Sequence, residues 1–212
     1  SPRAYTWGRG ASLVAAGSVI GLWLAIETTP LVLVIGAAGL FSGFFYSAPP
    51  IFLAGRGLGE LTVGLNFGLF AVTGSYVVQT SSIAAEALFA SLPVSFLITA
   101  LLYINEFPDY EADRATGKRT LVVRLGPAHA RYGLAALVAG AYLSVAAGLL
   151  LGHLPLPALI TFASLPAAAA GVRGLVRHYA GGAGLLPAIK SIILAHLLTG
   201  LLLAAALILS PR

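Results

Sequence analysis

The sequence has no cysteine and very few charged residues. The absence of cysteine excludes disulfides, thiolate metal sites and a cysteine nucleophile. Only 9% of the 212 residues are charged, whereas a soluble domain carries about 25%, so the charges cannot coat a water-soluble globule of this size. The scarcity of polar residues also excludes a disordered chain. With 58% hydrophobic residues and a mean hydropathy of +0.95, the sequence predicts an integral membrane protein.

Methionine is absent too, even at the first position. We therefore expect the sequence to be processed, excised or incomplete at its N-terminus. The net charge of +5 does not indicate a nucleic-acid partner, because basic residues of membrane proteins gather in cytosolic loops. No basic and aromatic residues are interleaved in a way that would suggest such a partner.

Long apolar stretches divide the chain into predicted membrane spans, since a membrane-crossing helix needs about 20 mostly apolar residues. Clusters rich in Pro, Gly, Ser and Thr separate these stretches. The seven predicted spans cover residues 11–27, 30–47, 60–80, 83–106, 127–151, 155–177 and 185–209. The sequence therefore predicts an all-α integral membrane protein with about seven transmembrane helices in a single domain, residues 1–212. Spaced small residues, such as Gly39 with Gly43 and Gly64 with Gly68, indicate closely packed helices.

Basic residues fall in alternate loops, which predicts the orientation of the chain. The N-terminal segment and the stretches 47–60, 107–131 and 173–190 hold every Lys and Arg except Arg212. Basic loops remain on the cytosolic side of a membrane. We therefore expect a multi-pass protein of the cell membrane, with a cytosolic N-terminus and an external C-terminus.

One predicted cytosolic loop holds most of the acidic side chains. Four of the chain's seven carboxylates lie within it, at Glu106, Asp109, Glu111 and Asp113. On a continuous helix, Asn105, Asp109 and Asp113 would share one face because each follows the last by four residues. Pro108 cannot donate a hydrogen bond to the carbonyl of Ile104, so the helix should kink or restart just before the aspartates.

The order of charges in this loop suggests a site for a metal-bound diphosphate. Two carboxylates one turn apart repel each other unless a cation lies between them, and Mg²⁺ is typically held by one or two carboxylates together with substrate phosphates. Arg114, Lys118 and Arg119 follow directly and would hold the remaining phosphate charge. The ordinary alternative is a solvated loop whose acids and bases pair with one another. Spacing alone leaves both interpretations open.

Two separate motifs resemble the UbiA superfamily of intramembrane prenyltransferases. The run Asn105-xxx-Asp109-xxx-Asp113-Arg-xx-Gly-Lys118-Arg119-Thr-Leu-xx-Arg-Leu-Gly is similar to the second aspartate-rich motif of that family. Its details resemble the 1,4-dihydroxy-2-naphthoate prenyltransferases of the menaquinone branch. Upstream, Tyr46-Ser47-xx-Pro50, then Arg56-Gly57-Leu58-Gly59-Glu60 and Asn66-Phe67-Gly68, resemble the loop after the fourth helix of that branch. The resemblance covers essentially the whole chain.

The resemblance implies a nine-helix bundle, of which this chain resembles the last seven helices. It implies Mg²⁺-dependent transfer of an isoprenyl group from a polyprenyl diphosphate to an aromatic acceptor such as 1,4-dihydroxy-2-naphthoate, within the lipid bilayer. The implied metal ligands are Asp109 and Asp113, with Asn105 as a helper. The implied diphosphate partners are Lys118, Arg119, Arg56 and Arg114. Tyr46 and Ser47 would line the cavity near the reacting carbon.

The chain departs from the family pattern at its start. The first aspartate-rich motif of the family is absent, and about two N-terminal helices are missing relative to the expected nine. We therefore expect this polypeptide to bind substrate poorly, and whether it is active alone stays open. Three explanations stay open: an excised or incompletely recorded form of a full enzyme, a partner chain that supplies the missing helices, and a non-catalytic relative. The last would be a membrane subunit that binds a quinone or isoprenoid tail.

Other classes of membrane protein fit the sequence less well. A retinal-type photoreceptor needs a lysine in the middle of its last span, whereas Lys190 lies at the edge of that span. A coupled transporter would show acidic residues or broken helices within the spans, and no acid falls in mid-span. His196 does lie inside a span, where an ionisable side chain is a functional candidate by default, although a hydrogen bond to a neighbouring helix explains it equally well. Glu60 suits the positive end of the helix that it begins.

Overall fold

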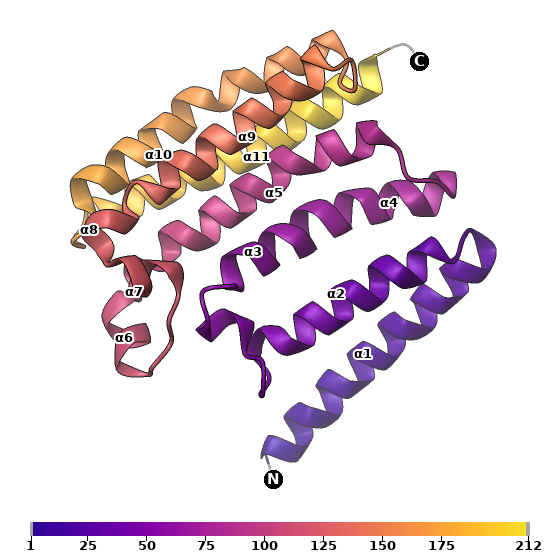
Figure 1. Ribbon diagram of the computed structural model, residues 1–212, viewed down its shortest axis with the longest axis horizontal. Helices are drawn as coiled ribbons and strands as arrows, with labels where there is room; N and C mark the ends of the chain where they lie inside the picture. The colour runs from indigo at the N-terminus through magenta and orange to yellow at the C-terminus, as the bar shows by residue number, and fades with distance from the viewer. Residues whose placement is uncertain (1, 211–212) are drawn as a thin grey trace.

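Figure 1 shows the computed structural model, which describes the backbone of residues 2–210 and the side chains from residue 10 to residue 210. Over that range the chain is built from helices and their connections, with no strand. The helices are α1 (Pro2–Glu27), α2 (Leu31–Ser47), η1 (Leu53–Gly55), α3 (Gly59–Val63), η2 (Gly64–Phe70), α4 (Ala71–Thr80), α5 (Ala85–Asn105), α6 (Tyr110–Ala115), α7 (Leu121–Leu125), α8 (Pro127–Ala130), α9 (Gly133–Leu150), η3 (Leu156–Ser164), α10 (Leu165–His178) and α11 (Leu185–Leu209).

The predicted membrane spans correspond to apolar helices. In the described part of the chain, six helical stretches are long and apolar enough to cross a membrane: Gly10–Glu27, Gly59–Thr80, Ala85–Asn105, Pro127–Leu150, Leu156–His178 and Leu185–Leu209. The predicted span 30–47 corresponds to α2, which is apolar but shorter, at 17 residues. The protein is therefore an all-helical, multi-pass membrane protein.

Small residues allow the close helix packing that their spacing predicts. In Figure 1 the span formed by α3, η2 and α4 lies beside α5. A Cβ added at Gly68 would overlap the backbone of Ser95 in α5, and one at Gly64 would overlap the side chain of Thr99. By contrast, a Cβ at Gly43 would meet nothing within 4 Å. The pair Gly64 and Gly68 is thus a true helix contact, because without side chains the two helix backbones can approach closely.

The two N-terminal helices lie at one edge of the molecule and expose most of their apolar side chains. Helix α2 has no buried residue, and Trp23 in α1 and Phe41 and Phe44 in α2 are more than half exposed. Figure 1 shows α1 beside α2 and α2 beside the α3–α4 span, on the side of the molecule away from α9, α10 and α11. Such apolar surface suits contact with lipid tails.

The helices alternate in direction, so the connections gather at two opposite ends (Figure 1). The start of α1, the α2–α3 connection, the segment with α6, α7 and α8, and the α10–α11 connection lie at one end. The α1–α2, α4–α5 and α9–η3 turns lie at the other end, where α11 also finishes. The segments predicted to be basic and cytosolic are therefore brought to the same end of the bundle.

Candidate functional site

The acidic segment begins where the long helix α5 ends. Helix α5 finishes at Asn105, and α6 begins at Tyr110 with Asp109 in the capping position. The predicted restart near Pro108 is confirmed, and the proline favours it because Pro108 has no N–H to donate to the carbonyl of Ile104 and its ring crowds that carbonyl. Asp109 and Asp113 then fall on consecutive turns, and the amide of Asp113 donates to the carbonyl of Asp109 at 2.8 Å.

Asn105 does not join the two aspartates. Its side-chain Nδ2 donates to the carbonyl of Leu101 at 2.7 Å, back along α5. The expectation that Asn105, Asp109 and Asp113 share one helical face is therefore wrong for Asn105. The physical reason is the break between α5 and α6, which removes the common helix on which the spacing argument depends.

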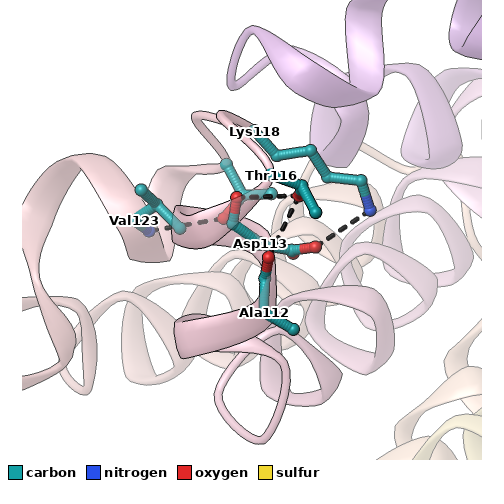
Figure 2. A network of polar contacts seen from close by, with 6 residues as sticks. Ala112, Asp113, Thr116, Lys118 and Val123 are labelled. Carbon is teal, nitrogen blue, oxygen red and sulfur yellow. Dashed lines mark hydrogen bonds and ion pairs between the residues drawn. The ribbon is translucent and has the colours of Figure 1, made fainter.

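Asp113 is held by the first basic residue after the turn. Its carboxylate is buried and forms an ion pair with Lys118 Nζ at 2.9 Å, as Figure 2 shows. The backbone closes the same loop, because the amide of Lys118 donates to the carbonyl of Asp113 at 2.9 Å. Thr116 Oγ1 also donates to the carbonyls of Ala112 and Asp113, at 3.0 and 3.1 Å. The hydrogen bond and charge of Asp113 raise the pKa of Lys118, so this lysine stays charged at neutral pH.

Tyr46 reaches the same place from a distant part of the sequence. It is half-buried near the end of α2, and its ring lies within electrostatic reach of Lys118 and Asp113. Asp109 also contributes to the electrostatic environment of Lys118. The structure thus pairs two of the predicted site residues, Asp113 and Lys118, and places Asp109 and Tyr46 in the electrostatic surroundings of Lys118. Ser47, the last residue of α2, is exposed.

The predicted arginines do not converge on the aspartates. Arg114 and Arg119 have exposed side chains, and among the described residues the only ion pair is the one between Lys118 and Asp113. Arg56 is also exposed, and its Nη2 donates to the carbonyl of Pro50 at 2.8 Å. These arginines lie at the same end of the bundle (Figure 1), but of the four predicted basic residues only Lys118 pairs with an aspartate.

Sequence reasoning missed how two loops are tied together. The amide of Arg119 donates to the carbonyl of Gly55 at 2.9 Å. The side chain of Arg124 adds two further bonds, from Nη2 to the carbonyl of Arg56 at 2.6 Å and from Nε to the carbonyl of Arg119 at 3.0 Å. Gly57 lies against this contact with a φ of +68°. We call residues 118–124 the basic segment, and these bonds fix it against the loop before α3.

Sequence reasoning also missed a buried pair of carboxyl groups. Glu60 at the start of α3 and Glu106 just after α5 are only 2% and 7% exposed. Their carboxyls are close enough to hydrogen bond to each other. Burial, and then the neighbouring Glu60, raise the pKa of Glu106 above its ordinary value. Glu60 was interpreted only as an acid at the positive end of a helix. The available signal was the presence of a carboxylate at the start of a membrane span.

The carboxylates of the site are too few to bind a divalent cation by themselves, so a bound ligand would have to complete the coordination. In the part of the chain that the structure describes, no three His, Cys, Asp or Glu side chains gather into a ready metal centre. Asp109 and Asp113 offer two carboxylates on consecutive helical turns. Mg²⁺ is usually bound through oxygen atoms. One or two protein carboxylates hold it, and substrate phosphates provide further ligands. The residues therefore fit a metal whose coordination is completed by a bound diphosphate.

Sequence comparison agrees with the motif arrangement. The profile of the UbiA prenyltransferase family matches residues 7–184. The chain belongs to the UbiA prenyltransferase family. Members of this family generally depend on a divalent metal. Because the match runs from α1 to the α10–α11 connection, it includes both the Tyr46 region and the acidic loop.

The names of several curated relatives describe enzymes that act on naphthoate or naphthoquinone compounds. The chain is 36% identical over 164 residues to the 2-carboxy-1,4-naphthoquinone phytyltransferase of Synechocystis, covering 76% of this chain and 52% of that protein. It is 28% identical over 192 residues to the 1,4-dihydroxy-2-naphthoate octaprenyltransferase of Bacillus subtilis, covering 91% of this chain and 61% of the relative. The enzyme of the same name from Mycobacterium tuberculosis is 31% identical over 196 residues, covering 92% and 65%. The chain thus spans about half to two thirds of these relatives. No solved structure matches it.

Proposed function

We propose that this protein is an intramembrane aromatic prenyltransferase of quinone biosynthesis that depends on Mg²⁺. The observation that carries the proposal is the ion pair of Asp113 with Lys118 at one end of a membrane bundle, one helical turn after Asp109. An acidic pair beside a lysine suits a metal-bound diphosphate, and the surrounding apolar spans suit an isoprenyl tail. The naphthoate relatives favour a polyprenyl diphosphate as donor and 1,4-dihydroxy-2-naphthoate as acceptor.

The chemistry follows from charge. Asp109 and Asp113 would hold Mg²⁺, with Asn105 at the end of α5 as the helper that the motif implies, and the metal would supply positive charge to the diphosphate leaving group. Lys118 would hold phosphate oxygens with its charged Nζ, and the exposed Arg119 at the same end would add a second donor. As the allylic C–O bond breaks, its electron pair leaves with the diphosphate, and stabilising that charge is the main source of acceleration.

The remaining predicted residues serve the organic part of the substrate. Tyr46 and Ser47, at the end of α2, would line the space in which an aromatic carbon attacks the allylic carbon. The ring then regains its aromaticity as the attacked carbon loses its own substituent, either a proton or a carboxylate that leaves as carbon dioxide. The neighbouring apolar helices would keep water from the allylic cation. Arg56 and Arg114 are further diphosphate partners in this proposal, from the two loops at the same end of the bundle. This end faces the cytosol of a cell-membrane protein, because it carries the basic loops.

The test is a prenyl-transfer assay on the detergent-purified chain with geranylgeranyl diphosphate, 1,4-dihydroxy-2-naphthoate and Mg²⁺. Asp109 is exposed, so Asp109→Asn should leave the fold intact and abolish Mg²⁺-dependent transfer. Glu111→Gln is the matched control, since Glu111 is an exposed carboxylate of the same short helix and has no proposed role. Unchanged transfer in Asp109→Asn would refute the site.

A binding measurement on the same sample separates the remaining alternatives. Mg²⁺-dependent binding of geranylgeranyl diphosphate without turnover would favour a non-catalytic subunit, or a requirement for a partner chain that supplies further helices. No Mg²⁺-dependent binding at all would refute the proposed function.

A further inference from the structure

The buried carboxyls of Glu60 and Glu106 both hold the start of α7. Oε1 of Glu60 accepts a hydrogen bond from the amide of Leu121 at 2.7 Å. The backbone amide of Val122 lies close enough to the carboxyl of Glu106 to offset part of the rise in its pKa. Glu60 is also fixed from behind, because Thr99 Oγ1 in α5 donates to its carbonyl at 3.2 Å. We call Glu60 and Glu106 the carboxyl clamp, which joins α3 and the end of α5 to the first turn of α7.

Helix α7 does not need two buried acids to begin. Thr120 already caps it, with Oγ1 accepting from the amide of Val123 at 3.3 Å. A capping hydroxyl is the ordinary solution for a helix start. The clamp is costly, since it takes two neighbouring acids out of water and requires them to share a proton. The arrangement therefore does more than cap a short helix.

What the clamp fixes is the backbone that carries the basic side chains. Lys118 and Arg119 are separated from the clamped residues Leu121 and Val122 only by Thr120. The far side of this backbone is tied by the bonds from the basic segment to the loop before α3, described above. The clamp binds this backbone on its buried side, and Arg124 binds it on its exposed side. Between them the positions of Lys118 and Arg119 have little freedom.

We propose that Glu60 and Glu106 are positioning residues for diphosphate binding. By holding the start of α7, they preset the backbone from Lys118 to Leu121 so that the Lys118 and Arg119 side chains meet the diphosphate without a cost of ordering the loop. Rigidity of this kind adds affinity by removing that cost. The inference rests on the proposed function, because it takes the diphosphate as the ligand of the basic segment.

The test measures the dissociation constant of geranylgeranyl diphosphate with Mg²⁺ for the full chain and its clamp variants. Glu60→Ala and Glu106→Ala should weaken binding by roughly ten- to a hundredfold, the usual worth of a hydrogen bond to a charged group. Glu60→Gln should restore most of the affinity, because its amide oxygen still accepts from Leu121. Glu111→Ala, which removes an exposed carboxylate at the same end of the bundle, is the control and should bind as the parent does.

A double-mutant cycle distinguishes positioning from general loss of structure. If the clamp acts through the basic segment, Glu60→Ala should cost little further affinity in an Arg119→Ala background. Fully additive losses, or parental affinity in both alanine variants, would overturn the proposal. Loss of Mn²⁺ binding in Glu60→Gln, measured without diphosphate, would also overturn the proposal, because Glu60 and Glu106 would then be metal ligands.

Trypsin cleavage after Lys118 and Arg119 reports on the basic segment independently of any substrate. Both alanine clamp variants should be cleaved there faster than the parent, while Glu60→Gln should not. If the parent binds no diphosphate, the proposed function fails and the diphosphate role of the clamp fails with it. Faster cleavage would then still show that the clamp orders the segment, and unchanged cleavage would refute the positioning itself.

Discussion

Replacing Gly57 by alanine tests whether the two loops of the site are held together as the structure shows. Gly57 has a φ of +68°, and a Cβ there would lie 2.8 Å from Arg124 Nε and 3.0 Å from the carbonyl oxygen of Arg119. The positive φ alone costs alanine about 1–2 kcal/mol. The methyl group also displaces Arg124, whose bonds to the carbonyls of Arg56 and Arg119 each contribute roughly 0.5–1.5 kcal/mol.

Gly117→Ala is a matched control for the backbone strain. Gly117 has a φ of +79° with nothing within 4 Å of an added Cβ, so its replacement costs only the strain. Gly57→Ala should therefore lower the free energy of loop opening by about 1–3 kcal/mol more than Gly117→Ala does. This difference corresponds to a factor of roughly 5 to 150 in the population of the open loops.

Limited trypsin digestion measures that difference, because cleavage follows the open population when opening is fast. Cleavage after Arg56 and Arg124 should be faster in Gly57→Ala than in Gly117→Ala by that factor. Equal cleavage rates in the two variants would show that Arg124 does not lock the loops, and the account of the basic segment would be wrong.

Two further predictions concern stability. Because burial and Glu60 raise the pKa of Glu106, the folded protein keeps a proton that the unfolded chain loses above its ordinary pKa of 4.5. The stability that this bound proton contributes is fully present below pH 4.5 and falls as the pH rises towards the pKa of Glu106 in the folded protein. The melting temperature in detergent should therefore decline from about pH 5 to about pH 9, and Glu106→Gln should flatten that decline. Gly68→Ala should lower the stability of the folded protein by about 1–3 kcal/mol, because the added methyl group overpacks against Ser95. Gly43→Ala, at an open position, should leave the melting temperature near that of the parent. Equal melting temperatures for the two variants would contradict the packing of η2 on α5.

The site links parts of the chain through backbone as much as through side chains. Arg124 contacts no acid in the structure, yet it joins the carbonyls of Arg56 and Arg119. Gly57 allows this contact by offering no side chain where Arg124 passes. The arginines predicted as diphosphate partners are therefore carried on loops whose positions depend on residues with no direct role in binding.

The sequence by itself determined the membrane architecture. Apolar stretches of sufficient length must form helices in lipid, since every backbone polar group there has to be satisfied within the segment, and breaker clusters separate them. Pro108 predicts the break before α6, because it removes one helical hydrogen bond and crowds the preceding turn, although α5 continues through Pro93. The family motif likewise lies in local sequence, so Asp109, Asp113 and Lys118 are recognisable from their order along the chain.

Only the tertiary structure decided which of these residues meet. Glu60 and Glu106 lie far apart in the chain, and their contact depends on how α3 packs on the end of α5, which no local pattern encodes. Tyr46 likewise enters the electrostatic surroundings of Lys118 only through the way α2 packs in the bundle. Asn105 shows the reverse case, since spacing predicts a shared face that the break in the helix abolishes. Helix periodicity is a local property, whereas the meeting of side chains depends on the packing of whole helices.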